Sequence, residues 1–199
     1  MKTFLIISLI IIILFVIIQT YIAMASTKSE TQPYEVIKVE KDFEIRHYPS
    51  ATFATISSKA LTYKDLGSSG FRKLAGFIFG GNSEDKQIAM TSPVHMDIND
   101  SASTMSFVMP LDYNETNLPK PKNSEVIIST SAEEHVAAIK FGGYASEIEI
   151  KEYSKKLKEA LKKASISYYG HFRFLGYNAP YQFFNRKNEV IISVNWTMK

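Results

Sequence analysis

The sequence predicts an α+β domain in which two helices pack on a curved antiparallel sheet. Short runs of alternating apolar and polar residues recur along the chain between turn residues, which is typical of antiparallel strands. Two longer stretches repeat apolar residues at helical spacing. The order strands, helix, strands occurs twice within 199 residues, which is long enough for one domain with a substantial core.

The first half opens with three short strand-like runs that are separated by turns. They cover residues 34–40, 43–48 and 51–57. A helix is expected over 63–79. Its apolar face carries Phe71, Leu74 and Ile78, and Gly80 begins a glycine pair that gives the backbone the freedom to end the helix. Further strands are expected at 87–90, 94–98 and 104–110.

The second half repeats this order of elements without an obvious sequence repeat. It follows a polar, proline-containing loop over residues 111–124. Its helix starts at Ser146, which is placed to form a capping box with Glu149. Acidic residues near the start of this helix and lysines near its end match the helix dipole. The strands of this half are expected at 126–130, 135–141, 172–177 and 189–195.

Composition excludes several classes of site. The chain has no cysteine, which rules out disulfides, a thiol nucleophile and cysteine-based metal centres. The formal charge is only +3, and the chain has no run of five or more basic residues. We therefore expect no nucleic-acid partner. The four histidines form no metal-binding motif, and no nucleophile elbow is present. We therefore do not expect an enzyme.

An almost wholly apolar run follows Lys2 and indicates a segment that targets the chain to a membrane. As a signal peptide it would end at the small-residue site Ala23-Met24-Ala25. As an anchor, residues 4–22 approach the ~20 residues that span a bilayer. Both alternatives stay open, and both leave Lys2 in the cytosol and deliver the domain across the membrane, either secreted or membrane-anchored. The expected parts are a leader or anchor, a linker and a domain, over residues 1–25, 26–33 and 34–199.

Several short motifs occur in the order found in the SOUL heme-binding family. They lie at residues 34–36, 43–48, 70–82, 90–94, 141–145, 176–180 and 186–190. Each is weak alone, but together they give a specific resemblance over almost the whole domain. The resemblance implies a distorted antiparallel β-barrel with two flanking helices in a pseudo-twofold arrangement. It also implies non-covalent binding of heme or another tetrapyrrole, without a common reaction.

The resemblance points to His47 as a candidate axial ligand of heme iron, because some family members carry a histidine at this hairpin position. A neutral imidazole offers the required lone pair, and strand alternation places His47 on the same face as Ile45. The alternative is a strand-end histidine that bonds to backbone. Likewise, Phe71, Leu74 and Ile78 could form an apolar wall for heme or simply the core face of their helix.

The remaining histidines are less suited to a ligand role. His95 lies between Met90 and Met96, a chemically suitable pairing, but methionines in strands usually fill a core. His135 and His171 are expected at the surface or in turns. The leading hypothesis is an exported or membrane-tethered heme or tetrapyrrole carrier or buffer. The alternative is a module of the same fold that binds another small molecule or a protein partner, with no physiological heme binding.

Overall fold

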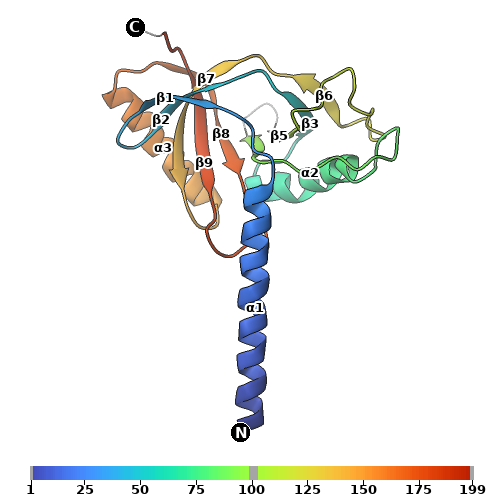
Figure 1. The fold of residues 1–199 in the computed structure, drawn as a ribbon. Helices are drawn as coiled ribbons and strands as arrows, with labels where there is room; N and C mark the ends of the chain where they lie inside the picture. The colour runs from blue at the N-terminus through green and yellow to red at the C-terminus, as the bar shows by residue number, and fades with distance from the viewer. Residues whose placement is uncertain (1, 99–102, 198–199) are drawn as a thin grey trace.

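The computed structural model describes residues 2–98 and 103–197. These residues form three helices and one nine-stranded antiparallel sheet that curls into a half-barrel (Figure 1). The helices are α1 (Lys2–Lys28), α2 (Tyr63–Ile78) and α3 (Glu147–Lys163). The strands are β1 (Glu35–Val39), β2 (Glu44–Tyr48), β3 (Thr52–Ser58), β4 (Val94–Ile98), β5 (Ser103–Val108), β6 (Ile127–Thr130), β7 (Glu134–Phe141), β8 (Tyr168–Gly176) and β9 (Asn188–Val194). The predicted α+β class is confirmed.

Two equivalent halves build the sheet. Its strand order is β1-β2-β7-β9-β8-β4-β5-β3-β6. In one half, β3 is followed by α2, β4 and β5, and β5 lies between β3 and β4. In the other, β7 is followed by α3, β8 and β9, and β9 lies between β7 and β8. The halves meet where β4 pairs with β8, so the pseudo-twofold arrangement is present in the order of strands.

The main core lies between the sheet and the two helices α2 and α3. The first of these packs on β3, β4 and β5, and the second on β7, β8 and β9. Each helix begins at a side-chain cap: Thr62 accepts a hydrogen bond from the Asp65 N–H, and Ser146 forms the predicted capping box with Glu149. Leu74 and Leu157, one from each helix, are fully buried in this core.

A second, smaller cluster occupies the opposite face of the sheet. Its apolar members include Tyr48, Val136 and Leu175. Beside them, the fully buried Arg46 guanidinium donates two hydrogen bonds to the Glu189 carboxylate, at 2.8 and 2.9 Å. Burial alone would raise the pKa of Glu189, but the hydrogen bonds and charge of Arg46 outweigh burial and hold it below its usual range.

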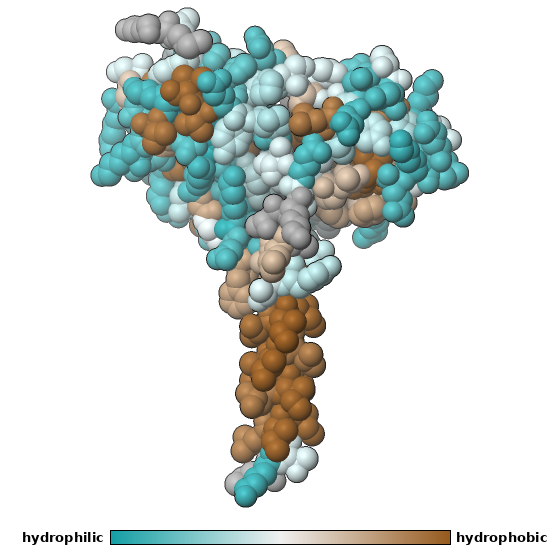
Figure 2. Space-filling model, viewed as in Figure 1, coloured by the Kyte–Doolittle hydropathy of each residue, from teal (hydrophilic) through white to brown (hydrophobic). Residues whose placement is uncertain are grey.

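Helix α1 projects from the domain as a stem (Figure 1). On the face that Figure 2 shows, the stem is apolar along most of its length, with more polar side chains at its lower end and where it meets the domain. The segment Lys2–Met24 is long and apolar enough to cross a membrane, and a signal sequence has the same properties. The helix continues to Lys28, so part of the expected linker is helical. Cleavage after residue 25 stays a prediction.

One expected strand is wrong. Residues 87–90 form no strand, and Gln87 makes only an isolated bridge with Phe79. The reason is that this segment turns back under the end of α2, where the Ile88 N–H donates to the Ile78 carbonyl at 2.8 Å. It therefore has no partner strand along its length. The other expected strands are confirmed, although β8 begins earlier, at Tyr168.

Candidate functional site

His47 lies beside a second histidine. It is on β2, where it is the direct partner of His135 on β7, and the two ring centroids are 5.0 Å apart. His47 Nε2 also lies 3.4 Å from a carboxylate oxygen of the exposed Glu133. The predicted alternation is confirmed, because Ile45 on the same face of β2 belongs to the main core. The pair remains partly open to solvent, with 26% of the His47 side chain exposed.

A cavity of about 300 Å³ adjoins this histidine pair, and we call it the distal cavity. His135 and Glu133 line it together with Tyr169, Val194 and Trp196. It lies at the end of β9 that is remote from α1 (Figure 1). Its volume is at the lower end of the range of roughly 300–1,000 Å³ for small-molecule sites, so a tetrapyrrole there would remain partly exposed.

Trp196 gives the distal cavity an aromatic surface. Its indole Nε1 is buried and has no hydrogen-bond partner among the described residues. Lys38 Nζ lies 5.9 Å from the centroid of the same ring. The cavity thus combines an aromatic side chain with a nearby cation. These groups fit an aromatic ligand that carries carboxylates, and heme carries two propionates.

The donor set around the cavity also fits heme iron. A histidine that ligates iron usually has its other ring nitrogen fixed by a carboxylate or carbonyl, and Glu133 lies beside His47 in that way. Within residues 2–98 and 103–197, no cluster of three or more His, Cys, Asp or Glu side chains is placed to hold a bare metal ion. If heme binds here, His47 is the residue that would hold its iron.

His95 is unsuited to an exposed ligand role. It is buried on β4, where its Nε2 lies 2.8 Å from Gln32 Oε1 and its ring meets Phe53 edge-on. Burial, with a smaller contribution from the charge of Arg173, lowers the pKa of His95 to about 3. The imidazole therefore stays neutral and its Nε2 is engaged by an amide. Met96 belongs to the main core, as strand methionines usually do.

The three residues expected on α2 lie on the other half of the sheet from His47. Leu74 and Ile78 are buried in the main core, and Phe71 is 38% exposed with its ring packed edge-on against Phe107. Because α2 packs on β3, β4 and β5, the structure does not bring these side chains together with His47. Their contact with a ligand stays a prediction.

The histidine pair could not be recognised from local patterns. His135 was expected at the surface or in a turn, and Trp196 was not singled out; both join His47 only through the pairing of β2 with β7 and of β7 with β9. The one sequence signal that could have found His135 is the alignment of two antiparallel strands that each carry a histidine near one end. That alignment requires the register, which single-strand periodicity does not fix.

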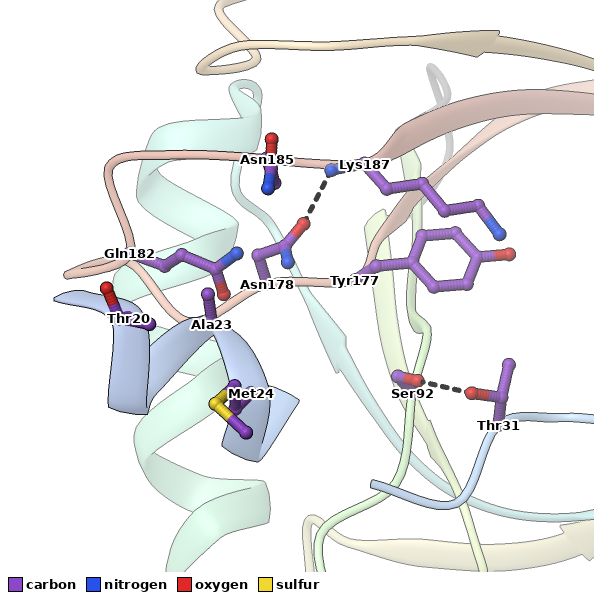
Figure 3. Close-up of a pocket in the computed structure, with 10 residues that line it drawn as sticks. All are labelled: Thr20, Ala23, Met24, Thr31, Ser92, Tyr177, Asn178, Gln182, Asn185 and Lys187. Carbon is purple, nitrogen blue, oxygen red and sulfur yellow. Dashed lines mark hydrogen bonds between the residues drawn. The ribbon is translucent and has the colours of Figure 1, made fainter. Parts of the chain in front are cut away.

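A second cavity, of about 480 Å³, lies where α1 meets the domain, and we call it the junction cavity (Figure 3). Thr20, Ala23 and Met24 of α1 form one wall. The opposite wall comes mainly from the loop between β8 and β9 and includes Tyr177, Asn178, Gln182, Asn185 and Lys187. Gln182 is buried, and its Oε1 has no hydrogen-bond partner among the described residues. This cavity therefore offers an unused acceptor.

Comparison with known proteins identifies relatives over most of the chain. The SOUL heme-binding protein family matches residues 29–193. The chain is 30% identical over 156 residues to Heme-binding protein 2 of Homo sapiens, which covers 74% of this chain and 76% of that protein. It is 28% identical over 166 residues to Heme-binding protein 2 of Mus musculus, with 79% and 80% covered. These relatives are named as binding proteins.

Solved structures show a similar fold at very low identity. The C-terminal domain of EcmrR aligns with a TM-score of 0.58 at 7% identity, over 82% of this chain and 99% of that chain. A hydrolase from Listeria innocua aligns with a TM-score of 0.56 at 8% identity, over 80% and 94%. At these identities the likeness concerns the fold alone. With a family match that covers most of the domain, the chain belongs to the SOUL heme-binding protein family.

Proposed function

We propose that this protein binds heme or a related tetrapyrrole non-covalently, as a carrier or buffer, while α1 tethers it to a membrane. The observation that carries the proposal is the His47–His135 pair at the edge of the distal cavity. His47 would supply the axial bond, with His135 as its neighbour and Glu133 orienting the ring. When bound, the heme iron would supply Lewis-acid and redox chemistry, and the protein would supply binding and orientation.

The chemistry of the surrounding residues supports the same ligand. The Trp196 ring offers a flat surface for a macrocycle, and its unpartnered N–H can donate to a carboxylate. Lys38 is a cation within reach of the same ring. No residue of the distal cavity is placed as a nucleophile with an activating base, and the named relatives are binding proteins, so we propose no catalytic role.

The contact between α1 and the domain supports a retained anchor. Gln19 is 6% exposed, although neighbouring side chains of α1 are largely exposed. Its Nε2 donates to the Tyr181 carbonyl at 3.2 Å, and its Oε1 accepts from the Phe183 N–H at 3.0 Å. Cleavage at the small-residue site would remove both bonds. We therefore propose α1 as an anchor, with a cleaved leader as the alternative.

Binding of another small molecule is a second candidate function, and the junction cavity favours it. That cavity is larger than the distal one, and the buried Gln182 Oε1 is an acceptor without a partner. A ligand with an N–H or O–H group could satisfy it. Such a ligand would bind at the membrane-proximal end of the domain, and its site would lose a wall if α1 were removed.

Titration of hemin into the full chain in detergent micelles tests the proposal and separates the two cavities. We expect a saturable shift of the Soret band at micromolar protein. His47→Ala should change the ligation spectrum, and His135→Ala should weaken binding, because the first removes the iron ligand and the second a cavity wall. His171→Ala is the matched control, since His171 is an exposed histidine on β8.

The outcomes of this titration are distinct. An unchanged hemin spectrum in the presence of wild-type protein would refute tetrapyrrole binding. A Soret shift that survives both histidine substitutions but is lost in Gln182→Ala would place the ligand in the junction cavity instead.

A further inference from the structure

The loop between β8 and β9 exposes large aromatic side chains and buries a polar one. Tyr181, Phe183 and Phe184 expose 61%, 52% and 60% of their surface, whereas Gln182 between them is only 2% exposed. A water-facing loop normally shows the reverse pattern, with polar side chains outside. Three large aromatic side chains in four residues therefore present a largely exposed apolar surface, which the rest of the described domain touches at the Phe183 ring through Tyr144, with ring centroids 6.2 Å apart.

Polar side chains inside the loop hold this arrangement in place. Arg186 Nη1 donates at 2.7 Å to the carbonyls of both Ala179 and Gln182. Gln182 Nε2 donates to the Phe184 carbonyl at 2.8 Å. The Arg186 guanidinium also lies 4.3 Å from the centroid of the Tyr144 ring. Because the backbone is fixed from within, the aromatic side chains are presented in a defined position.

Contacts with α1 fix the position of this loop along the axis of that helix. Gln19 follows the apolar run of α1 and bonds to the backbone of Tyr181 and Phe183. The Phe183 ring also contacts Phe15, with ring centroids 5.9 Å apart. Phe15 lies about one helical turn, roughly 6 Å, closer to the N-terminus than Gln19. The loop is therefore beside the last turns of the apolar stem, as Figure 1 shows.

We propose that Tyr181, Phe183 and Phe184 insert into the headgroup and acyl boundary of the bilayer that holds α1. This inference rests on the proposed anchor. If α1 spans a membrane, Phe15 lies within its apolar layer, and the contact with Phe183 carries that side chain to the same depth. Aromatic side chains are favoured at this boundary, and amphipathic elements bury their apolar face about 5–10 Å into it.

The lipid contact would fix the orientation of the domain. A single helix leaves a tethered domain free to tilt about the membrane surface, whereas a second contact beside the helix restricts that tilt. The distal cavity, at the opposite end of β9, would then face away from the membrane and stay open to soluble partners. The junction cavity would lie at the lipid surface.

Depth-dependent fluorescence quenching tests this proposal. Trp196 is the only tryptophan, so Trp196→Phe provides a silent background for Phe183→Trp, Phe15→Trp and Tyr169→Trp. Tyr169 is a matched control, because it is 51% exposed at the far end of the domain. Each full-length variant is placed in nanodiscs with and without brominated lipids. The series can be repeated in the wild-type background, where Trp196 adds the same signal to each variant.

We expect brominated lipid to quench position 183 nearly as strongly as position 15 and to leave position 169 unquenched. Quenching at 15 without quenching at 183 would refute the lipid contact of the loop and leave the anchor intact. No quenching at 15 would refute the anchor itself, and the loop proposal with it. Equal quenching at 183 and 169 would show lipid contact without a defined orientation and would also overturn the proposal.

Discussion

Arg46 is the largest fully buried side chain among the described residues, and its charge is paired with two carboxylates, the buried Glu189 and the partly exposed Glu44. The Tyr34 ring covers the guanidinium at 4.1 Å, and the Tyr177 hydroxyl donates to Glu189 at 2.6 Å. Burial raises the pKa of Tyr48, in the same cluster, to about 12, so this hydroxyl stays neutral. Such a network favours one arrangement of the strands, because any slip leaves a charge unpaired.

Removing either Arg46 or Glu189 alone should lower the free energy of unfolding far more than removing both. Arg46→Met leaves the Glu189 carboxylate buried without its main partner, and we expect the free energy of unfolding to fall by about 3–5 kcal/mol at neutral pH. The double variant Arg46→Met/Glu189→Met should recover most of this loss. Lys156→Met is the control, because it breaks only exposed contacts within α3, the ion pair with Glu152 and the cation-π contact with Tyr153, and should change stability little. Urea unfolding measures all three.

The pH dependence gives this prediction a second readout. The pKa of Glu189 is lower in the folded protein than in the unfolded chain, so its contribution is present above the unfolded pKa and is lost as pH falls through the folded one. In Arg46→Met, burial should instead raise the pKa of Glu189, and protonation at low pH should relieve the unpaired charge. The difference in stability between wild type and variant should therefore shrink from pH 7 to pH 4. A constant difference would contradict this account.

Residue-level patterns predicted the face of His47 but not its neighbour. Alternation along one strand follows from local geometry, so the shared face with Ile45 could be read from the sequence. The contact with His135 depends on the register of two strands that are distant in the chain. The burial of His95 depends likewise on Gln32, which reaches it from the segment before β1. Contacts of this kind are set by tertiary packing, which local periodicity does not contain.

At the scale of elements, the two helices and most strands could be predicted because each has one buried face. The Ser146 cap and the apolar face of α3 are local signals that the folded protein keeps, whereas the Thr62 cap of α2 was not predicted. The segment at 87–90 was expected to be a strand and is not one. Its backbone bonds at its start to the end of α2 instead.

The glycines at the end of α2 allow a matched test of this turn. A Cβ on Gly81 would lie 2.5 Å from the Gly76 carbonyl oxygen, whereas a Cβ on Gly76 would have no neighbour within 4 Å. We expect Gly81→Ala to destabilise the protein by about 1–3 kcal/mol, since a backbone atom cannot easily yield. Gly76→Ala should stabilise it by about 0.5–1 kcal/mol, because alanine favours a helix interior.

Thermal unfolding of the two variants measures both effects. Equal shifts in the same direction would show that α2 does not end in the tight turn described here.

At the scale of the molecule, two cavities lie at opposite ends of β9, one beside the stem and one remote from it. The family could be recognised from the order of short motifs, because those motifs build the scaffold. The distal cavity could not be predicted from the sequence, because residues from β7, β8 and the segment after β9 form it together. The contact between α1 and the loop at 181–183 also escaped prediction, since nothing in the leader specifies it.

The central claim is that a tetrapyrrole binds in the distal cavity, and Trp196 gives a direct measurement of it. Labelling with ¹⁵N-tryptophan yields a single indole signal, because the chain has one tryptophan. Trp196 is one of the residues that line the distal cavity. We predict that paramagnetic ferric hemin broadens this signal beyond detection in the full chain in detergent micelles, and that diamagnetic zinc protoporphyrin only shifts it. An indole signal unchanged by saturating hemin would contradict the claim.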